Sequence, residues 1–130
     1  MSNPKLNIIV VDDDAQMNQA IERLLNAAGF HAVTFQSAEA LLAAGAVANA
    51  ACMVLDIHLP GLSGFELRQR LEQEGARAPV IFITAYDDPE SRAQAQEAGA
   101  TAYFTKPFPR QSFLTAIDRA IHPSSREENK

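Results

Sequence analysis

Near its N-terminus the chain reads Leu6-Asn7-Ile8-Ile9-Val10-Val11-Asp12-Asp13-Asp14, an apolar run that ends in three successive carboxylates. Such a short run, rich in β-branched residues and nearly continuous in apolar ones, is typical of a strand buried on both faces. Four more runs of this kind follow, at Ala32–Phe35, Ala51–Leu55, Val80–Ile83 and Ala102–Phe104. The sequence therefore predicts five strands, the first of them Leu6–Val11.

Segments with helical periodicity separate these runs. The first extends from Ala15 to Ala28 and stops at Gly29, since glycine favours helix ends. A capping box, Ser63 with Glu66, opens another helix. The helix that begins after Ser63 is predicted to extend to about Glu74. The other predicted helices are Ser37–Gly45, Pro89–Ala98 after the cap Asp88, and a last helix that Pro109 opens. The last helix has an apolar core stripe of Phe113, Leu114, Ile117 and Ile121. Strands alternating with helices predict an α/β fold with a parallel sheet.

Length and composition fit one ordinary globular domain. The 130 residues carry a net charge of −5, and 47% are hydrophobic. We assign 1–122 to the domain and the polar residues 123–130 to a tail or linker. No apolar run approaches the ~18 residues of a membrane span, and only Lys5 precedes the first apolar run, so neither a membrane segment nor a signal peptide is expected. The acidic balance argues against direct binding of nucleic acid.

The cysteine and histidine content excludes two further kinds of site. Cys52 is the only cysteine, so no internal disulfide is possible and a cytoplasmic location is expected. Because Cys52 lies within an apolar run, we expect a buried small hydrophobe and not a nucleophile. His31, His58 and His122 are far apart and have no cysteine companions, and this spacing argues against a zinc site.

Polar side chains follow four of the five predicted strands. Asp12 and Asp13 come after the first, Asp56 after the third, Thr84 after the fourth and Lys106 after the fifth. In a doubly wound sheet the carboxyl ends of the strands share one edge, where ligands bind. Three carboxylates there would repel one another, and a divalent cation together with one ammonium would cancel their charge. Oxygen ligands favour Mg²⁺, with Mn²⁺ as an alternative.

With such an ion present, a carboxylate can attack phosphorus, as in aspartyl-phosphate enzymes. Asp56 is the best candidate nucleophile because it comes alone from its segment, whereas Asp12 and Asp13 are placed to hold metal. Asp14 precedes the first helix, and we expect it to cap that helix and not to bind metal.

Four motifs in this order resemble the receiver domain of two-component response regulators. They are Ile9–Asp14, Val54–Gly64, Phe82–Ala85 and Ala102–Phe108. The resemblance extends from about Leu6 to Ile121 and implies a (βα)5 flavodoxin-like, CheY-like fold with strand order 2-1-3-4-5. Phe35-Gln36-Ser37-Ala38-Glu39 and Ala85–Pro89 resemble the FixJ-like group of these domains.

The resemblance also implies roles for single residues at the metal site. Asp56 would be the phosphoacceptor. Asp13, Asp56 and the backbone carbonyl of His58 would bind Mg²⁺, with Asp12 assisting. His58 and Tyr86 lie at variable positions beside the reaction centre, where a larger side chain could hinder the water that hydrolyses the phosphoryl group.

Further implied roles concern the output of the domain. Thr84 and Lys106 would contact the phosphoryl group, Thr84 and Tyr103 would form the switch pair, and the bond before Pro107 would be cis. The helix Pro89–Ala98 has alanine as its main apolar residue, so it buries little area and can shift at small cost. We expect phosphorylation to draw Thr84 toward the phosphoryl oxygens, Tyr103 to turn inward into the vacated space, and this helix to resettle.

The expected partner is a sensor histidine kinase that donates the phosphoryl group. The face formed by the last two helices and the last strand would bind a partner or a second copy, as a homodimer. FixJ-like receivers usually precede a helix-turn-helix, DNA-binding output domain. None is found in this sequence, so we expect either a stand-alone receiver or a chain that ends in the linker to such a domain. The domain would catalyse only its own phosphorylation and dephosphorylation. Two alternatives use similar folds: an aspartate-nucleophile phosphatase, and a flavin binder, whose phosphate the three aspartates would repel.

Overall fold

The computed structural model describes residues 6–45 and 49–123, in which five strands alternate with five helices. The strands are β1 (Asn7–Val11), β2 (His31–Phe35), β3 (Ala50–Asp56), β4 (Val80–Thr84) and β5 (Ala102–Thr105). The helices are α1 (Ala15–Ala27), α2 (Ala38–Ala44), α3 (Gly64–Gln73), α4 (Pro89–Glu97) and α5 (Arg110–Ile121). Of the predicted tail, residues 124–130 lie outside the described part of the chain.

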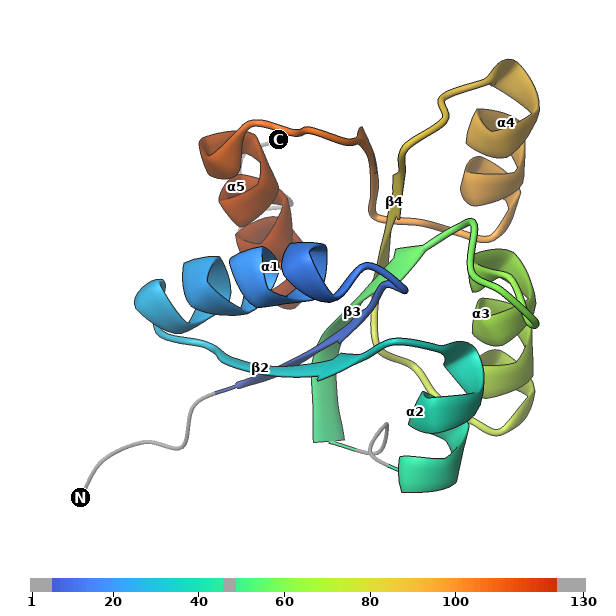
Figure 1. Ribbon diagram of the computed structural model, residues 1–130, viewed down its shortest axis with the longest axis horizontal. Coiled ribbons are helices and arrows are strands. Elements are labelled where there is room, and N and C mark those ends of the chain that lie inside the picture. Colours follow the sequence, from blue (N-terminus) through green and yellow to red (C-terminus); the bar gives the residue numbers. More distant parts are fainter. Residues whose placement is uncertain (1–5, 46–48, 124–130) are drawn as a thin grey trace.

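All neighbouring strands are parallel, and their order is β2-β1-β3-β4-β5. Helices α1 and α5 cover one face of the sheet, and α2, α3 and α4 cover the other (Figure 1). The predicted α/β fold and strand order are confirmed. Strand order reverses between β1 and β3, so the loops after these two strands diverge and leave a crevice at the carboxyl edge.

Two apolar layers hold the sheet, one on each face. Alternate residues of β1 point into different layers, with Ile9 beside the helices α2 to α4 and Ile8 beside α1 and α5. Phe82 is the largest fully buried side chain of the first layer and Phe113 of the second. Because both faces of β1, β3 and β4 are covered, the ends of these strands are held firmly and can position polar side chains.

Cys52 is buried in β3 and free of any disulfide, as predicted. Burial raises the pKa of its thiol to about 12, so the neutral thiol packs as a small apolar group at physiological pH.

Most helix ends lie where the capping residues predict. Ser63 and Glu66 form both hydrogen bonds of the capping box at the start of α3. Asp88 caps α4, whose first residue is Pro89. Pro109 keeps an extended backbone (ψ 133°) as the N-cap residue, so α5 begins one residue later than the predicted opening. In residues 6–45 and 49–123 no helix is both long enough and apolar enough to span a bilayer.

The role of Asp14 as a helix cap is directly testable. Asp14 Oδ1 accepts from the backbone N–H of Gln16 at 2.9 Å and of Met17 at 3.4 Å. We expect Asp14→Ala to lower the free energy of unfolding by about 0.5–2 kcal/mol, measured by urea denaturation. Asp14→Asn keeps an acceptor at the cap and should retain most of that stability. Equal losses in both variants would contradict the capping role.

Candidate functional site

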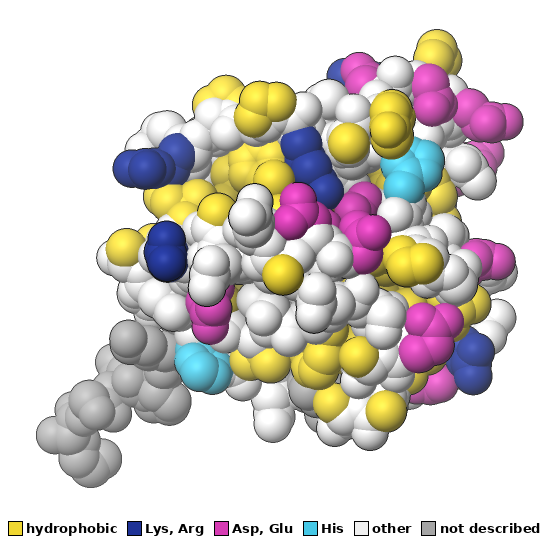
Figure 2. Space-filling view, viewed as in Figure 1, with side chains coloured by type: hydrophobic (Ala, Val, Ile, Leu, Met, Phe, Trp, Pro, Cys, Tyr) yellow, Lys and Arg dark blue, Asp and Glu magenta, His cyan; other side chains and the backbone are white. Residues whose placement is uncertain are grey.

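Four strands deliver the predicted site residues to one edge of the sheet. Asp12 directly follows β1, Asp56 and Thr84 are the last residues of β3 and β4, and Lys106 directly follows β5. Because β1, β3, β4 and β5 are consecutive in the sheet, these side chains form a row along its carboxyl edge. Figure 2 shows acidic side chains adjoining a basic one near the centre of this face, with a histidine close by.

Lys106 reaches across β4 to the two buried carboxylates. Its Nζ lies 2.6 Å from Asp12 Oδ2 and 3.1 Å from Asp56 Oδ2. The side chains of Asp12 and Asp56 are 0% and 5% exposed, and that of Lys106 is 14% exposed. One ammonium therefore serves two carboxylates in a region with little water, where ion pairs are strong and unpaired charges are costly.

Asp13 completes an acidic group that can hold a cation. One carboxylate oxygen from each of Asp12, Asp13 and Asp56 lies within 4.8 Å of the others. The exposed Asp13 opens the group to solvent, whereas Asp12 and Asp56 are buried. Three carboxylates against one ammonium leave an excess of two negative charges, which one divalent cation would neutralise.

One buried oxygen of this group has a single charged neighbour. Asp12 Oδ2 is paired with Lys106 Nζ at 2.6 Å and has no other hydrogen-bond donor among the described residues. A carboxylate oxygen has more than one lone pair, so Asp12 Oδ2 can bind a cation while it also faces the amine. The oxygen-rich donor set fits a hard divalent cation such as Mg²⁺.

Burial and charge act on the two ends of the ion pair. Burial raises the pKa of Asp12, and the nearby Asp56 charge adds to this while Lys106 opposes it. Partial burial disfavours the Lys106 ammonium, but Asp12 and Asp56 outweigh burial and raise the pKa of Lys106. The amine is therefore charged at neutral pH.

Two amide side chains that the sequence reasoning missed hold the acidic loop in place. Asn18 of α1 is buried, and its Nδ2 donates to the carbonyls of Asp12 (2.8 Å) and Phe35 (3.1 Å). Gln36 Nε2 donates to the carbonyl of Asp13 at 3.4 Å. Asn18 carries a detectable signal, because it is a polar residue on the otherwise apolar face of the predicted helix.

The loop after β3 packs tightly behind the candidate phosphoacceptor. The His58 N–H donates to Asp56 Oδ1 at 3.0 Å, and the Gly64 N–H donates to the Ile57 carbonyl at 3.0 Å. A Cβ at Gly64 would lie 2.4 Å from the backbone oxygen of Asp56. Only glycine lets α3 begin this close to the end of β3.

The Thr84 side chain is hydrogen-bonded to the backbone of Tyr86 at the mouth of the site. Thr84 Oγ1 donates to the Tyr86 carbonyl and accepts from the Tyr86 N–H, both at 3.0 Å. Tyr86 is 71% exposed, and its ring lies edge-on to the His58 ring, with centroids 5.8 Å apart. The two predicted tuning residues therefore contact each other beside Asp56, and the Thr84 hydroxyl is engaged by its own loop.

Tyr103 lies away from the acidic group, at the outer side of β5. Its hydroxyl donates to Asp87 Oδ1 at 3.1 Å. Asp87 also receives two hydrogen bonds from Arg92, of 2.7 and 2.8 Å. Neither Asp87 nor Arg92 was expected to matter from the sequence, since single surface charges carry no pattern. The Lys106–Pro107 bond, the cis candidate, is cis.

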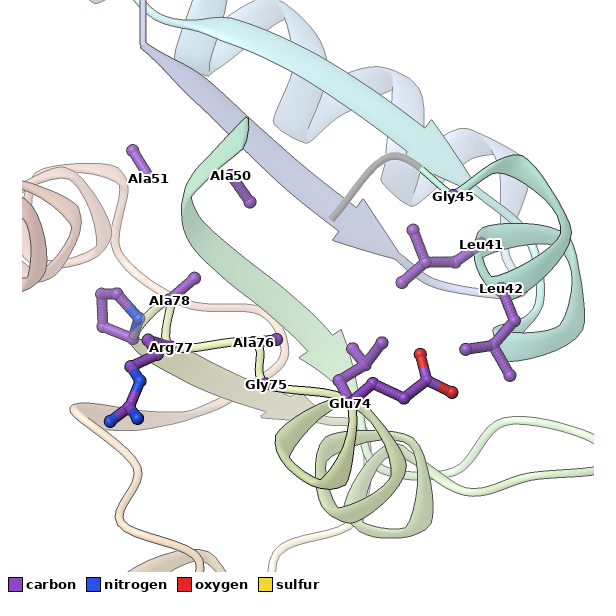
Figure 3. Close-up of a pocket in the computed structure, with 12 residues that line it drawn as sticks. Leu41, Leu42, Gly45, Ala50, Ala51, Glu74, Gly75, Ala76, Arg77 and Ala78 are labelled. Carbon is purple, nitrogen blue, oxygen red and sulfur yellow. The ribbon is translucent and has the colours of Figure 1, made fainter. Parts of the chain in front are cut away.

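A pocket of about 710 Å³ lies at the opposite edge of the sheet. Figure 3 shows Leu41 and Leu42 projecting from α2 on one side of it and residues 74–78 on the other. Its charged lining residues, within the described part of the chain, are Glu74 and Arg77. This pocket has neither the clustered carboxylates nor the lysine found at the carboxyl edge of the sheet. The candidate functional site is therefore the group at the carboxyl edge.

Comparison with known proteins agrees with this geometry. Residues 8–118 match the family described as the response regulator receiver domain. The chain belongs to this family. Receiver domains are the phosphoacceptor signalling units of two-component systems, and they partner with histidine kinases. They bind Mg²⁺ in an acidic pocket, and in this chain Asp12, Asp13 and Asp56 form an acidic group at the corresponding edge of the sheet.

Curated relatives place this receiver domain in the FixJ-like group, as predicted. The transcriptional regulatory protein TdiR of Thauera aromatica is 36% identical over 114 residues, covering 88% of this chain and 50% of TdiR. FixJ of Bradyrhizobium diazoefficiens is 33% identical over 127 residues, covering 95% of this chain and 62% of FixJ. The chain thus spans only about half to three-fifths of these relatives.

The fold agrees with solved structures of regulators. The response regulator StyR superposes with a TM-score of 0.84 at 34% identity, covering 97% of this chain and 64% of that one. The BeF3-activated receiver domain of DrrB gives a TM-score of 0.82 at 30% identity, covering 91% of this chain and 98% of that one.

The close packing at Gly64 should be essential to this receiver domain. In Gly64→Ala the new methyl group would collide with the Asp56 backbone, so we expect a loss of about 1–3 kcal/mol in unfolding free energy and a much slower gain of phosphoryl mass from acetyl phosphate.

Gly75→Ala is the matched control for this substitution. Gly75 has a φ of +93°, and a Cβ added there would meet no atom within 4 Å. Alanine at this position therefore costs about 1–2 kcal/mol from backbone strain alone without disturbing Asp56. Phosphorylation rates that fall equally in both variants would contradict a specific role for Gly64.

Proposed function

We propose that this receiver domain accepts a phosphoryl group on Asp56 from a phosphohistidine of a sensor histidine kinase. The observation that carries the proposal is the setting of the Asp56 carboxylate. One oxygen is held by the His58 N–H at 3.0 Å and the other by Lys106 Nζ at 3.1 Å. Asp12 and Asp13 lie within the same acidic group, so an oriented nucleophile, a cation site and an amine converge at one point.

In the proposed reaction, an Asp56 carboxylate oxygen attacks phosphorus and an O–P bond forms as the N–P bond breaks. The electron pair of the broken bond stays on the histidine imidazole of the kinase, and this imidazole is the leaving group. Phosphoryl transfer asks a protein mainly for alignment and for neutralisation of the oxygens on phosphorus. Lys106 supplies one positive charge close to Asp56, and its contact with Asp12 keeps the amine in place.

Asp12, Asp13, Asp56 and the His58 backbone carbonyl would hold Mg²⁺, or Mn²⁺ in its place. When bound, the ion supplies two positive charges opposite the phosphoryl oxygens. Thr84 would contribute a hydroxyl donor to the phosphoryl group once it leaves the Tyr86 carbonyl. The paired rings of His58 and Tyr86 would limit the approach of the water that hydrolyses the acyl phosphate, and so tune its lifetime.

The kinase would approach over a groove next to Lys106 in the chain. This groove, of about 490 Å³, lies between α1 and the start of α5. Its lining is mostly apolar and includes two arginines: Met17, Ala20, Ile21, Arg23, Leu24, Ala27, Pro107, Phe108 and Arg110. Figure 2 shows apolar surface next to the charged group on this face. Because Pro107 directly follows Lys106, a partner seated there has its phosphohistidine near Asp56.

The output would leave through the face formed by α4, β5 and α5. Helix α4 buries only Ser91 and Ala95, and Ala93 is exposed, so its attachment is as weak as its alanine content predicts. A shift of α4 would change the surface offered to a partner or to a second copy in a homodimer. Since TdiR and FixJ are named as transcriptional regulatory proteins, we propose control of transcription through a DNA-binding domain outside this chain.

By this proposal the domain is a signalling phosphoacceptor and converts no metabolite. No observation favours the phosphatase alternative, and the aspartates after β1 disfavour a bound flavin phosphate. We also propose residues 1–122 as the receiver domain and a cytoplasmic location, which the free and buried Cys52 suits.

Intact-mass analysis after incubation with acetyl phosphate tests the phosphoacceptor. We expect the parent protein to gain one phosphoryl group in the presence of Mg²⁺ and essentially none with a chelator. Asp56→Asn should gain none under either condition, because an amide oxygen is not a nucleophile for phosphorus.

The matched control is Asp118→Asn, which removes an exposed acid of α5 (70% exposed) that is not part of the acidic group. It should be phosphorylated like the parent protein. A parent that gains no phosphoryl mass, or an Asp56→Asn variant that gains as much as the parent, would refute the proposal.

A further inference from the structure

Three side chains tie the loop after β4 to α4 and β5. Asp87 comes from the loop, Arg92 from α4 and Tyr103 from β5. Arg92 Nε and Nη2 donate to the two oxygens of Asp87 at 2.7 and 2.8 Å, and the Tyr103 hydroxyl donates to Asp87 Oδ1 at 3.1 Å. The Arg92 guanidinium also lies 5.0 Å from the centroid of the Tyr103 ring. Tyr103 is therefore held by two neighbours that are themselves paired.

This arrangement is more ordered than an ordinary surface ion pair. Both oxygens of Asp87 are engaged, and a planar bidentate pair fixes orientation as well as distance. Hydrogen bonding to Arg92 lowers the pKa of Asp87, while partial burial, followed by the hydrogen bond to Asp87, raises the pKa of Tyr103. At neutral pH the carboxylate is charged and the phenol is protonated, which are the states that the hydrogen bond requires.

The same short loop also holds Thr84. Thr84 Oγ1 makes two hydrogen bonds to the backbone of Tyr86, the residue directly before Asp87. If Thr84 turns toward a phosphoryl group on Asp56, it must give up its bonds to Tyr86, and a displacement of this loop would carry Asp87 away from Tyr103. The two members of the proposed switch pair are thus restrained through one segment of backbone.

We infer that Asp87, braced by Arg92, is a positioning residue that holds Tyr103 outward and so stabilises the unphosphorylated form of the domain. The inference rests on the proposed function, since it assumes that Tyr103 turns inward on phosphorylation. Asp87 and Arg92 take no part in the reaction itself. They set how readily the domain changes from the unphosphorylated to the active form. Loss of this restraint raises the fraction of molecules already in the active form.

The test uses ¹⁹F NMR of the protein labelled with 3-fluorotyrosine. The chain has two tyrosines, so Tyr86→Phe assigns the Tyr103 resonance. The phosphoryl analogue is beryllofluoride with Mg²⁺. In Asp87→Ala we expect the free protein's Tyr103 resonance to move toward its position in the analogue-bound parent. We also expect the half-saturating beryllofluoride concentration to fall by about three- to tenfold, because apparent affinity scales with the competent fraction.

Two further variants separate this role from a general effect of charge. Arg92→Gln leaves Asp87 free of its brace and should shift both readings in the same direction by a smaller amount. Glu90→Ala removes another acid from the first turn of α4 and should leave both readings at the parent values.

The outcomes distinguish the inference from the proposed function. If the parent binds beryllofluoride and its Tyr103 resonance moves, but Asp87→Ala behaves like the parent, the positioning role is refuted and the proposed function stands. If Glu90→Ala shifts the readings as much as Asp87→Ala, the effect is one of net charge and the positioning role is refuted as well. If the parent binds no analogue, the proposed function and the inference are overturned together.

Discussion

A single amine holds together the charges on which the rest of this domain depends. The Lys106 amine lies within 3.1 Å of the buried carboxylates of Asp12 and Asp56. These carboxylates come from the ends of β1 and β3, whereas Lys106 follows β5. Without it, Asp12 and Asp56 would be buried charges without a cationic partner, which proteins rarely tolerate. With it, the acidic group still keeps two excess negative charges once Asp13 is counted. The site therefore has an incomplete charge balance, which a divalent cation would complete.

The fold explains how such an arrangement can exist. Five parallel strands end at one edge of the sheet, and the apolar layers on both faces keep those ends from relaxing apart. Local devices then refine the positions: Asn18 fixes the loop after β1, and Gly64 brings α3 against the end of β3. Repulsion among the carboxylates is thus offset by packing elsewhere, a common relation between a functional site and its scaffold.

The strands, helices and capping residues were predictable from sequence because each has a local cause. Apolar runs identify β1 and β4, and the Ser63–Glu66 pair marks the start of α3. The row of site residues was predictable because strand ends share an edge in this class of fold. The links among Asp87, Arg92 and Tyr103 were not, because they join an exposed loop, a helix face and a strand whose register only the folded chain defines. The same holds for Glu39, which accepts a hydrogen bond from the Leu62 N–H in the loop after β3.

The most direct test of the charge balance is the unfolding free energy of the parent protein and of Asp13→Asn, each in a chelator and in saturating Mg²⁺. In the chelator the variant should be the more stable protein, because the substitution removes one of three crowded negative charges. In Mg²⁺ the order should reverse, since the parent gains about 2.7 kcal/mol at a hundred times its dissociation constant and the variant gains less. A variant that is less stable in the chelator, or a parent that Mg²⁺ does not stabilise, would contradict the central claim.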